Sequence, residues 1–185
     1  MIDDFVSDAT RRMDKSVEAA AHEFNTVRTG RASAALLDRI QVDYYGTPTP
    51  LQQLATINVP EPRMITVQPY DPGSIKAIER AILESDLGLT PSNDGKIVRL
   101  PIPQLTEERR KELVKVVKHL AEEGRVAVRN VRRDVMHDLK ELVKNGDVGD
   151  DEERRAEAQV QKITDEHTKS IDDLLKVKEA EIMEV

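Results

Sequence analysis

Four arginines fall within ten residues, in the segment RVAVRNVRRD that spans residues 125–134. They are Arg125, Arg129, Arg132 and Arg133. A guanidinium group presents a planar fork of donors that can bind two oxygens of one phosphate and stack on a base. Spacings of three and four residues place these side chains on one face of an α-helix. The pattern indicates a phosphate-binding surface, although acidic residues of a neighbouring helix could equally neutralise such a row.

Positive charge is concentrated in this part of an otherwise acidic chain. The formal net charge is -7 over 185 residues. Residues 105–146 carry 11 basic and 8 acidic side chains, net +3, whereas residues 147–185 carry 6 and 13, net -7. The overall acidity argues against general nucleic-acid binding, so we expect any contact with phosphate to be local.

The residues that most enzymes need are missing or scattered. The chain has no Cys, no G-x-x-x-x-G-K-[ST] loop and no metal-ligand spacing among its four His. We therefore expect no catalytic residue, no metal site and no cofactor. The start, MIDDFVSD, lacks the features of a signal peptide, and no apolar run is long enough to cross a bilayer. These observations predict a cytoplasmic protein without a membrane partner.

Helical periodicity and proline positions divide the chain. Apolar residues at three- and four-residue steps predict long helices over about 3–29, 106–144 and 151–184. All nine prolines lie between positions 48 and 103, where alternating apolar residues and turn signals predict strands. The expected strands and helix are RIQVDYY, LATINV, MITVQP, SIKAIERAIL (helix) and KIVRLPIP, with YYGTPTP as a loop.

The predicted fold class is therefore α+β: a long three-helix bundle with a small β/α/β domain inserted between its first and second helices. We assign 1–30 and 105–185 to the bundle and 31–104 to the insertion. Two chain crossings join the domains and could form a hinge, or a rigid elbow stiffened by proline. The predicted hinge residues are Thr29, Gly30, Arg31, Pro101, Pro103 and Gln104.

Five segments in this order resemble the bacterial ribosome recycling factor family. They are RTGRAS (28–33), YYGTPTPLQQLA (44–55), SDLGL (85–89), LPIPQLTEERRKEL (100–113) and RVAVRNVRRD (125–134). The resemblance implies an L-shaped monomer whose bundle binds large-subunit ribosomal RNA of the post-termination ribosome. It also implies that elongation factor G supplies GTP hydrolysis for splitting the subunits.

The resemblance assigns RNA contacts to Arg129, Arg132 and Arg133, and to Arg28 and Arg31 near the hinge. One residue departs from the expected pattern: Gly124 stands inside the second helix, where glycine costs roughly 0.5–1 kcal/mol relative to alanine. Close helix approach or local softness could explain it. From the residues alone, two other functions remain open: a helical adaptor that binds a protein client, and a ribosome dormancy factor.

Overall fold

The chain divides into two compact units. The computed structural model describes residues 1–184. One unit, the bundle, comprises Met1–Thr29 and Glu107–Glu184, and the other, the small unit, comprises Gly30–Thr106. These boundaries lie one and two residues from the predicted ones.

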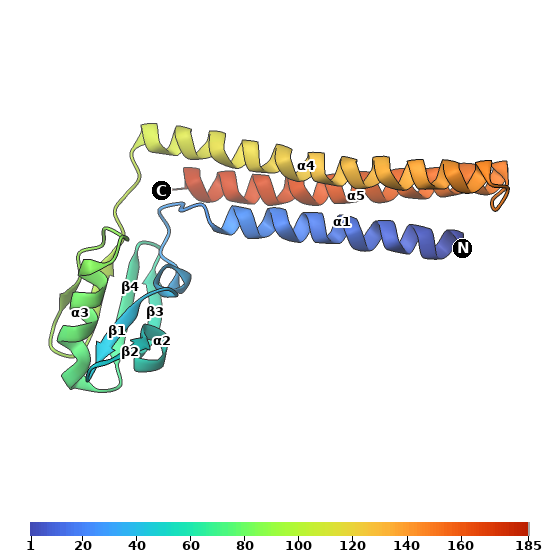
Figure 1. Cartoon of the computed structure of the whole chain (residues 1–185). Coiled ribbons are helices and arrows are strands. Elements are labelled where there is room, and N and C mark those ends of the chain that lie inside the picture. The colour runs from blue at the N-terminus through green and yellow to red at the C-terminus, as the bar shows by residue number, and fades with distance from the viewer. Residues whose placement is uncertain (185) are drawn as a thin grey trace. The chain divides into compact units, whose positions relative to one another are not determined.

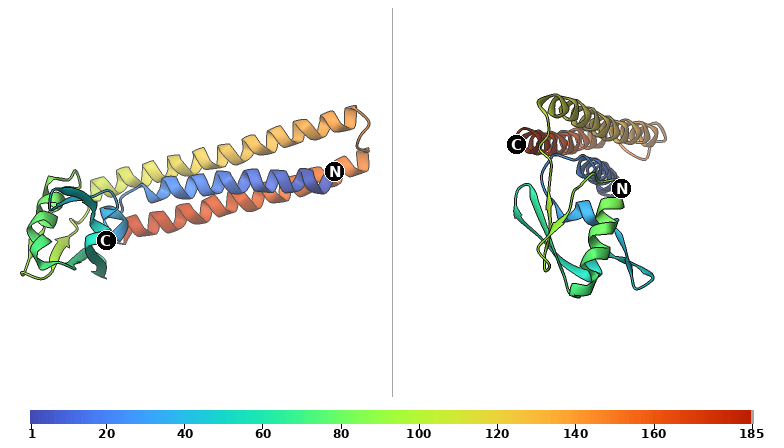
Figure 2. Two further views of the ribbon diagram at one scale, coloured as in Figure 1. Left: turned by 60° about the horizontal axis from the view of Figure 1, so that its bottom comes forward. Right: turned by 90° about the vertical axis from the view of Figure 1, so that its left-hand side faces the viewer.

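Three long helices lie side by side in the bundle (Figures 1 and 2). They are α1 (Ile2–Asn25), α4 (Glu107–Lys144) and α5 (Asp150–Met183). Acidic residues occupy the first turn of each, where they interact favourably with the helix dipole. Helix α1 ends before Thr26, whose hydroxyl and backbone N–H both donate to the carbonyl of Glu23, at 2.7 and 3.1 Å. The predicted helix, which extended to residue 29, was therefore too long.

An apolar stripe on each of the three helices contributes to the core of the bundle. On α4 it consists of Leu113, Val117, Ala121, Gly124, Val128, Val131, Val135 and Leu139. A Cβ added to Gly124 would lie 3.1 Å from both the Ala20 Cβ and the Ile171 Cδ1. Close approach of α1 and α5 to α4 therefore explains this glycine, because a larger side chain would push the helices apart.

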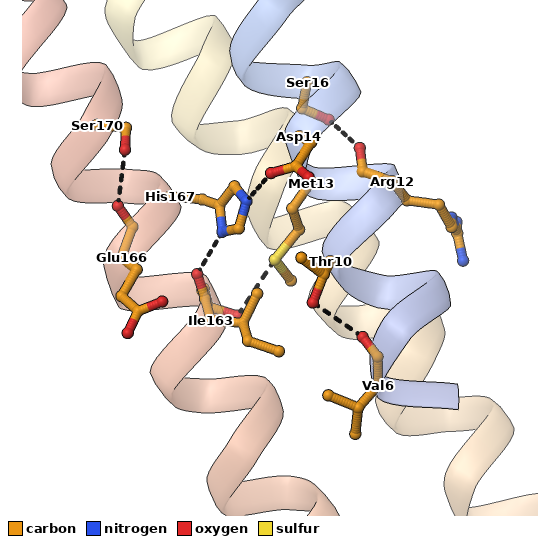
Figure 3. Close-up of polar contacts among 11 residues, drawn as sticks. Val6, Thr10, Arg12, Met13, Asp14, Ser16, Ile163, Glu166, His167 and Ser170 are labelled. Carbon is orange, nitrogen blue, oxygen red and sulfur yellow. Dashed lines mark hydrogen bonds and ion pairs between the residues drawn. The ribbon is translucent and has the colours of Figure 1, made fainter. Parts of the chain in front are cut away.

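Polar contacts also join α1 to α5, and Figure 3 shows them in detail. The half-buried ring of His167 places Nε2 at 2.6 Å from the Asp14 carboxylate and Nδ1 at 2.7 Å from the Ile163 carbonyl. The buried Thr164 hydroxyl donates to the Val160 carbonyl at 2.7 Å, which satisfies its donor within α5. The contact between His167 and Asp14 thus joins α5 to α1 beside the apolar stripe.

The small unit contains two antiparallel sheets and a covering helix. The first sheet pairs β1 (Gln41–Tyr44) with β2 (Thr47–Pro50), and the second has the strand order β3-β4-β6-β5. Its strands are β3 (Ala55–Glu61), β4 (Met64–Pro69), β5 (Ser92–Asn93) and β6 (Val98–Pro101). The helical elements are η1 (Ala34–Leu37), α2 (Leu51–Leu54), η2 (Pro72–Ser74) and α3 (Ile75–Glu84). The apolar faces of α3 and both sheets form the core.

The segment YYGTPTP differs from its prediction as a loop, because residues 47–50 form β2. Tyr45 and Gly46 have φ angles of 50° and 86° and make the two-residue turn of the β1–β2 hairpin. The two prolines oppose Asp43 and Gln41, two positions apart on the same strand. Alternate residues of an antiparallel pair carry the ladder bonds, so prolines at this spacing leave those bonds to Thr47 and Thr49. The short strand β5 was not among the predicted strands either.

Candidate nucleic-acid interface

A shallow groove of about 820 Å³ lies between α4 and α5. Its lining residues on α4 are Arg129, Arg132, Arg133, Met136, His137 and Lys140, and on α5 they are Arg154, Glu157, Ala158 and Gln161. Five of these side chains are Arg or Lys, and only one is acidic. The residues from Arg129 to Lys140 cover about 16 Å of the α4 axis at 1.5 Å per residue. The groove is therefore a compact cationic surface.

Two of the predicted arginines are oriented by neighbours but keep part of their charge available. Arg129 donates to Glu122 at 2.6 Å, and its side chain remains 52% exposed. Arg132 donates to the neutral Gln161 amide oxygen at 2.8 Å, and Gln161 in turn donates to Asp165. Because its partner in that hydrogen bond carries no charge, the guanidinium of Arg132 is positioned without being neutralised by it.

Three further cations of the groove have no hydrogen-bonding or ion-pair partner within residues 1–184. They are Arg133, Lys140 and Arg154, and all three side chains are exposed. Unpaired cations on both sides of one groove can bind phosphate oxygens without first breaking an internal ion pair. This arrangement suits a nucleic-acid backbone better than a small ligand, since the groove is open.

Arg125 lies apart from the groove and is neutralised. Its side chain is 22% exposed and donates to Glu122 at 3.0 Å and to Asp172 of α5 at 2.6 Å. Burial lowers the pKa of Arg125, but the hydrogen bonds to Glu122 and Asp172 outweigh it and raise the pKa above its ordinary value. The pKa of Glu122 is lowered, first by its hydrogen bond with Arg125. Acidic neighbours therefore neutralise Arg125, as the sequence left open for the whole arginine row. Its bond to Asp172 joins α4 to α5.

Sequence reasoning missed Arg154. The periodicity of a single helix shows which residues share its face, but it does not show which faces of two helices border one groove. The acidic surroundings of Arg154, in DDEERRAE, also hid it. The only available signal was that an arginine near the start of α5 must lie close to the end of α4, because a short turn joins these helices.

Arg28 and Arg31 are both exposed, on either side of the boundary between the units. Arg28 follows α1 in the bundle, and Arg31 is the second residue of the small unit. Neither lines the groove between α4 and α5. Their assignment to RNA binding therefore remains a prediction from the resemblance.

The predicted hinge residues have unequal surroundings. Gly30 has a φ of +78°, and a Cβ added there would lie 3.0 Å from the Leu105 Cγ. The two connecting segments, one around Gly30 and the other around Leu105, are therefore in contact. Pro101 belongs to β6 opposite Met64, and Ile102 donates its N–H to the Arg63 carbonyl at 2.8 Å. Buried Thr29 and exposed Arg31 flank Gly30, while exposed Pro103 and Gln104 follow the sheet. Among these six residues, Pro101 is the one held within a β-strand.

None of the helices within residues 1–184 combines the length and apolar character needed to cross a membrane.

Comparison with protein families and with known proteins gives one consistent result. Residues 20–183 match the family model described as "Ribosome recycling factor". The ribosome-recycling factor of Rubrobacter xylanophilus is 61% identical over 180 residues, which cover 97% of both chains. That of Geobacillus sp. strain WCH70 is 55% identical over 185 residues, which cover 100% of both chains. The resemblance inferred from the sequence is confirmed.

Solved structures give the same result for the fold. The solution structure of a ribosome recycling factor is 43% identical, with a TM-score of 0.75, and the match covers 100% of this chain and 98% of that one. A second match has a TM-score of 0.65 and 48% identity, covering 99% of both chains. That structure describes the Thermus thermophilus factor and Escherichia coli elongation factor G bound to the E. coli post-termination complex. The predicted α+β class, a helical bundle with a small inserted domain, is confirmed.

Proposed function

This chain belongs to the ribosome recycling factor family, its function is ribosome recycling, and we propose that it binds the post-termination ribosome through the cationic groove between α4 and α5. In this proposal the partner surface is ribosomal RNA of the large subunit. Elongation factor G acts together with this chain and hydrolyses GTP, and the subunits then separate. The chain itself contributes binding and movement, with no catalytic residue and no cofactor, and works as a cytoplasmic monomer.

The observation that carries the RNA assignment is the presence of unpaired cations on both helices. Arg133 and Lys140 from α4 and Arg154 from α5 are exposed and have no ion-pair partner within residues 1–184. Arg129 and Arg132 lie beside them, already oriented by Glu122 and Gln161. A phosphate that enters the groove can therefore meet donors from two helices, and positioned donors lose little side-chain entropy on binding. We retain Arg28 and Arg31 as further RNA contacts and omit Arg125.

The test compares two adjacent arginines of α5. Arg154 lines the groove, whereas Arg155 is also exposed but does not line it. We expect Arg154→Ala to weaken binding to purified ribosomes by about 1 kcal/mol and to reduce the slope of log K against log salt by about one. Arg155→Ala is the matched control and should leave both quantities unchanged. Co-sedimentation at increasing salt measures them, and equal behaviour of the two variants would refute the groove assignment.

The mechanical part of the proposal needs a separate test. We propose that movement of the small unit occurs at Gly30 and at the segment from Pro103 to Gln104. Gln104→Pro should stiffen this segment, because it restricts backbone rotation next to an existing proline. Ribosome binding should be retained while the rate of subunit splitting, measured by light scattering with elongation factor G and GTP, falls. Gln104→Ala is the control, and unchanged splitting by Gln104→Pro would count against movement here.

A further inference from the structure

All three tyrosines of the chain lie in the small unit, and two of them share one carboxylate. The hydroxyl groups of Tyr44 and Tyr45 donate to the Asp71 Oδ2 at 3.1 and 3.2 Å. Their rings are in an edge-to-face arrangement with centroids 4.6 Å apart. Tyr70 directly precedes Asp71 in the chain. We call Asp43, Tyr44, Tyr45 and Asp71 the tyrosine patch.

The patch exposes large aromatic surfaces that packing does not require. Tyr45 is 79% exposed and Tyr70 is 68% exposed, and they are the exposed aromatic residues of the chain within residues 1–184. Single exposed apolar residues are common on protein surfaces and mean little by themselves. Here, however, the hydrogen bond to Asp71 holds the ring of Tyr45 in one place. A fixed, solvated aromatic ring loses little entropy when a partner covers it.

Tyr45 also occupies a position that suits other residues better. Its φ is 50°, within the left-handed region, and it is the first residue of the β1–β2 turn. Asn, Asp and Gly are the preferred residues there because they adopt this conformation most readily. A tyrosine at this site gains a bond to Asp71 but leaves most of its ring in water. An outlier of this kind is a reason to look for a role of the side chain in binding.

Charge around the rings selects the class of partner. Segments 41–50 and 68–75 contain two carboxylates, Asp43 and Asp71, and no Lys or Arg. Backbone N–H groups stabilise both carboxylates: Gly46 donates to Asp43 and Gly73 donates to Asp71, each at 2.9 Å. The bond from Gly73, and then that from Tyr44, hold the pKa of Asp71 below its ordinary value. The patch therefore keeps negative charge, and the nearest cations along the chain are Arg39 and Lys76.

We propose that the tyrosine patch binds a basic segment of a protein partner, with an Arg or Lys side chain lying on the exposed ring of Tyr45 and bonding the Asp71 carboxylate. Aromatic faces attract cations, and a guanidinium can stack on a tyrosine while its edge donates to a carboxylate. RNA is disfavoured at this surface because the carboxylates repel phosphate. This interaction does not depend on the groove of the bundle, so either proposal can fail without the other.

The absence of Trp and the presence of only three Tyr make the patch directly observable. In the full chain carrying ¹³C-labelled tyrosine rings, the NMR resonances of Tyr44 and Tyr45 report on the patch, and that of exposed Tyr70 is an internal reference. The probes are the peptide Gly-Arg-Gly-Arg-Gly, its counterpart Gly-Glu-Gly-Glu-Gly, and hexauridylate. We expect a saturable shift of the Tyr45 signal with the arginine peptide only. No saturable shift, or an equal response to either of the other probes, would overturn the proposal.

Tyr45→Asn separates binding from folding, because asparagine suits the turn that tyrosine occupies under strain. This variant should keep the backbone NMR spectrum of the sheets and weaken binding of the arginine peptide by about fivefold. Leu83→Ser removes a side chain that is 64% exposed on α3 and is the control, with unchanged affinity. If Tyr45→Asn disrupts the hairpin, Asp71→Asn tests the same surface by removing charge while keeping shape. Undiminished affinity in a folded Tyr45→Asn variant would refute the proposed role of the ring.

Discussion

The bundle and the small unit place polar groups on their surfaces in opposite ways. In the bundle, an apolar core supports long helices, and the groove between α4 and α5 displays Arg133, Lys140 and Arg154, which have no acidic partner within residues 1–184. In the small unit, turns and short strands hold neutral aromatic rings beside carboxylates. The bundle thus offers donors to an anion, whereas the tyrosine patch offers acceptors and aromatic faces to a cation. One chain can therefore bind chemically different partners without competition between them.

The difference follows from how each unit is stabilised. A three-helix bundle leaves the outer faces of its helices free, so a whole row of charges can be placed there at little cost in stability. The small unit has short elements joined by turns, and its carboxylates accept hydrogen bonds from the backbone N–H groups of these turns. Asp94, for example, accepts from the N–H groups of Lys96 and Ile97 at 3.0 and 2.9 Å.

The largest expected effect comes from filling the closest approach between helices. Gly124→Leu would force side-chain atoms into Ala20 and Ile171, and overpacking of this kind should destabilise the bundle by about 3 kcal/mol. Chemical unfolding can be followed separately for each unit, by helical circular dichroism for the bundle and by tyrosine fluorescence for the small unit. Gly124→Ala should be nearly neutral, because its gain in helix propensity offsets the tight contact. Equal destabilisation of both units by Gly124→Leu would mean that they do not fold independently.

A smaller effect is expected in the small unit from Gly30→Ala. The new Cβ would lie 3.0 Å from the Leu105 Cγ, and the residue would be held at a φ of +78°. We expect a loss of about 2 kcal/mol in the unfolding free energy reported by tyrosine fluorescence. Gly88→Ala is a matched control, because Gly88 has a φ of +68° but no atom within 4 Å of the added Cβ. A difference between the two variants measures the contact with Leu105, and no difference would show that backbone strain alone matters.

Arg125→Ala should reduce the stability of the bundle by about 1 kcal/mol, because it leaves Asp172 without its partner at 2.6 Å. Ribosome affinity should remain that of the unmodified chain, since Arg125 lies outside the groove. Arg129→Ala provides the reverse case: this side chain is more exposed, so stability should change little while affinity falls. If Arg125→Ala weakened ribosome binding more than Arg129→Ala did, the division between structural and binding arginines would be wrong.

The smallest effect is acid sensitivity of the turn at Asp94. Backbone N–H groups of Ile97 and Lys96, followed by the bond from Arg99, lower the pKa of Asp94 to about 2 from its ordinary 3.8. A depressed folded-state pKa stabilises the protein above the unfolded value, and this contribution is lost as the pH falls from about 4 to about 2. The protection of the Lys96 and Ile97 amides against hydrogen exchange, relative to their intrinsic rates, should therefore fall in that range. Asp94→Asn should remove the pH dependence, and its persistence would assign it to another group.

Much of the fold could be predicted from the sequence because apolar spacing is strong in long elements. Helix α4 ends at Lys144, as expected, and α5 begins within one residue of its predicted start. Strand β2 lies in YYGTPTP, which was predicted as a loop, and only the partner strand shows that Pro48 and Pro50 interrupt no ladder bond. Local patterns thus predict elements well, but they do not show pairing.

The candidate site was predictable only in part for the same reason. Arg129, Arg132 and Arg133 share one face of α4, which the helical period reveals. The neutralisation of Arg125 by Asp172 and the contribution of Arg154 both depend on α5, so neither follows from the spacing within α4. Gly124 indicated a close helix approach in advance, with local softness as the alternative, and the positions of Ala20 and Ile171 beside it decide for close approach.

The insertion of the small unit between α1 and α4 has a consequence for the order of folding. Arg12 of α1 bonds Asp134 of α4, 122 residues away, and Met13 lies against Thr164, 151 residues away. Helices α4 and α5, by contrast, form a local hairpin. During its own synthesis the chain therefore releases α1 first, yet this helix must wait for nearly the whole chain before its apolar stripe can be covered. We expect nascent α1 to be the segment most dependent on protection from aggregation.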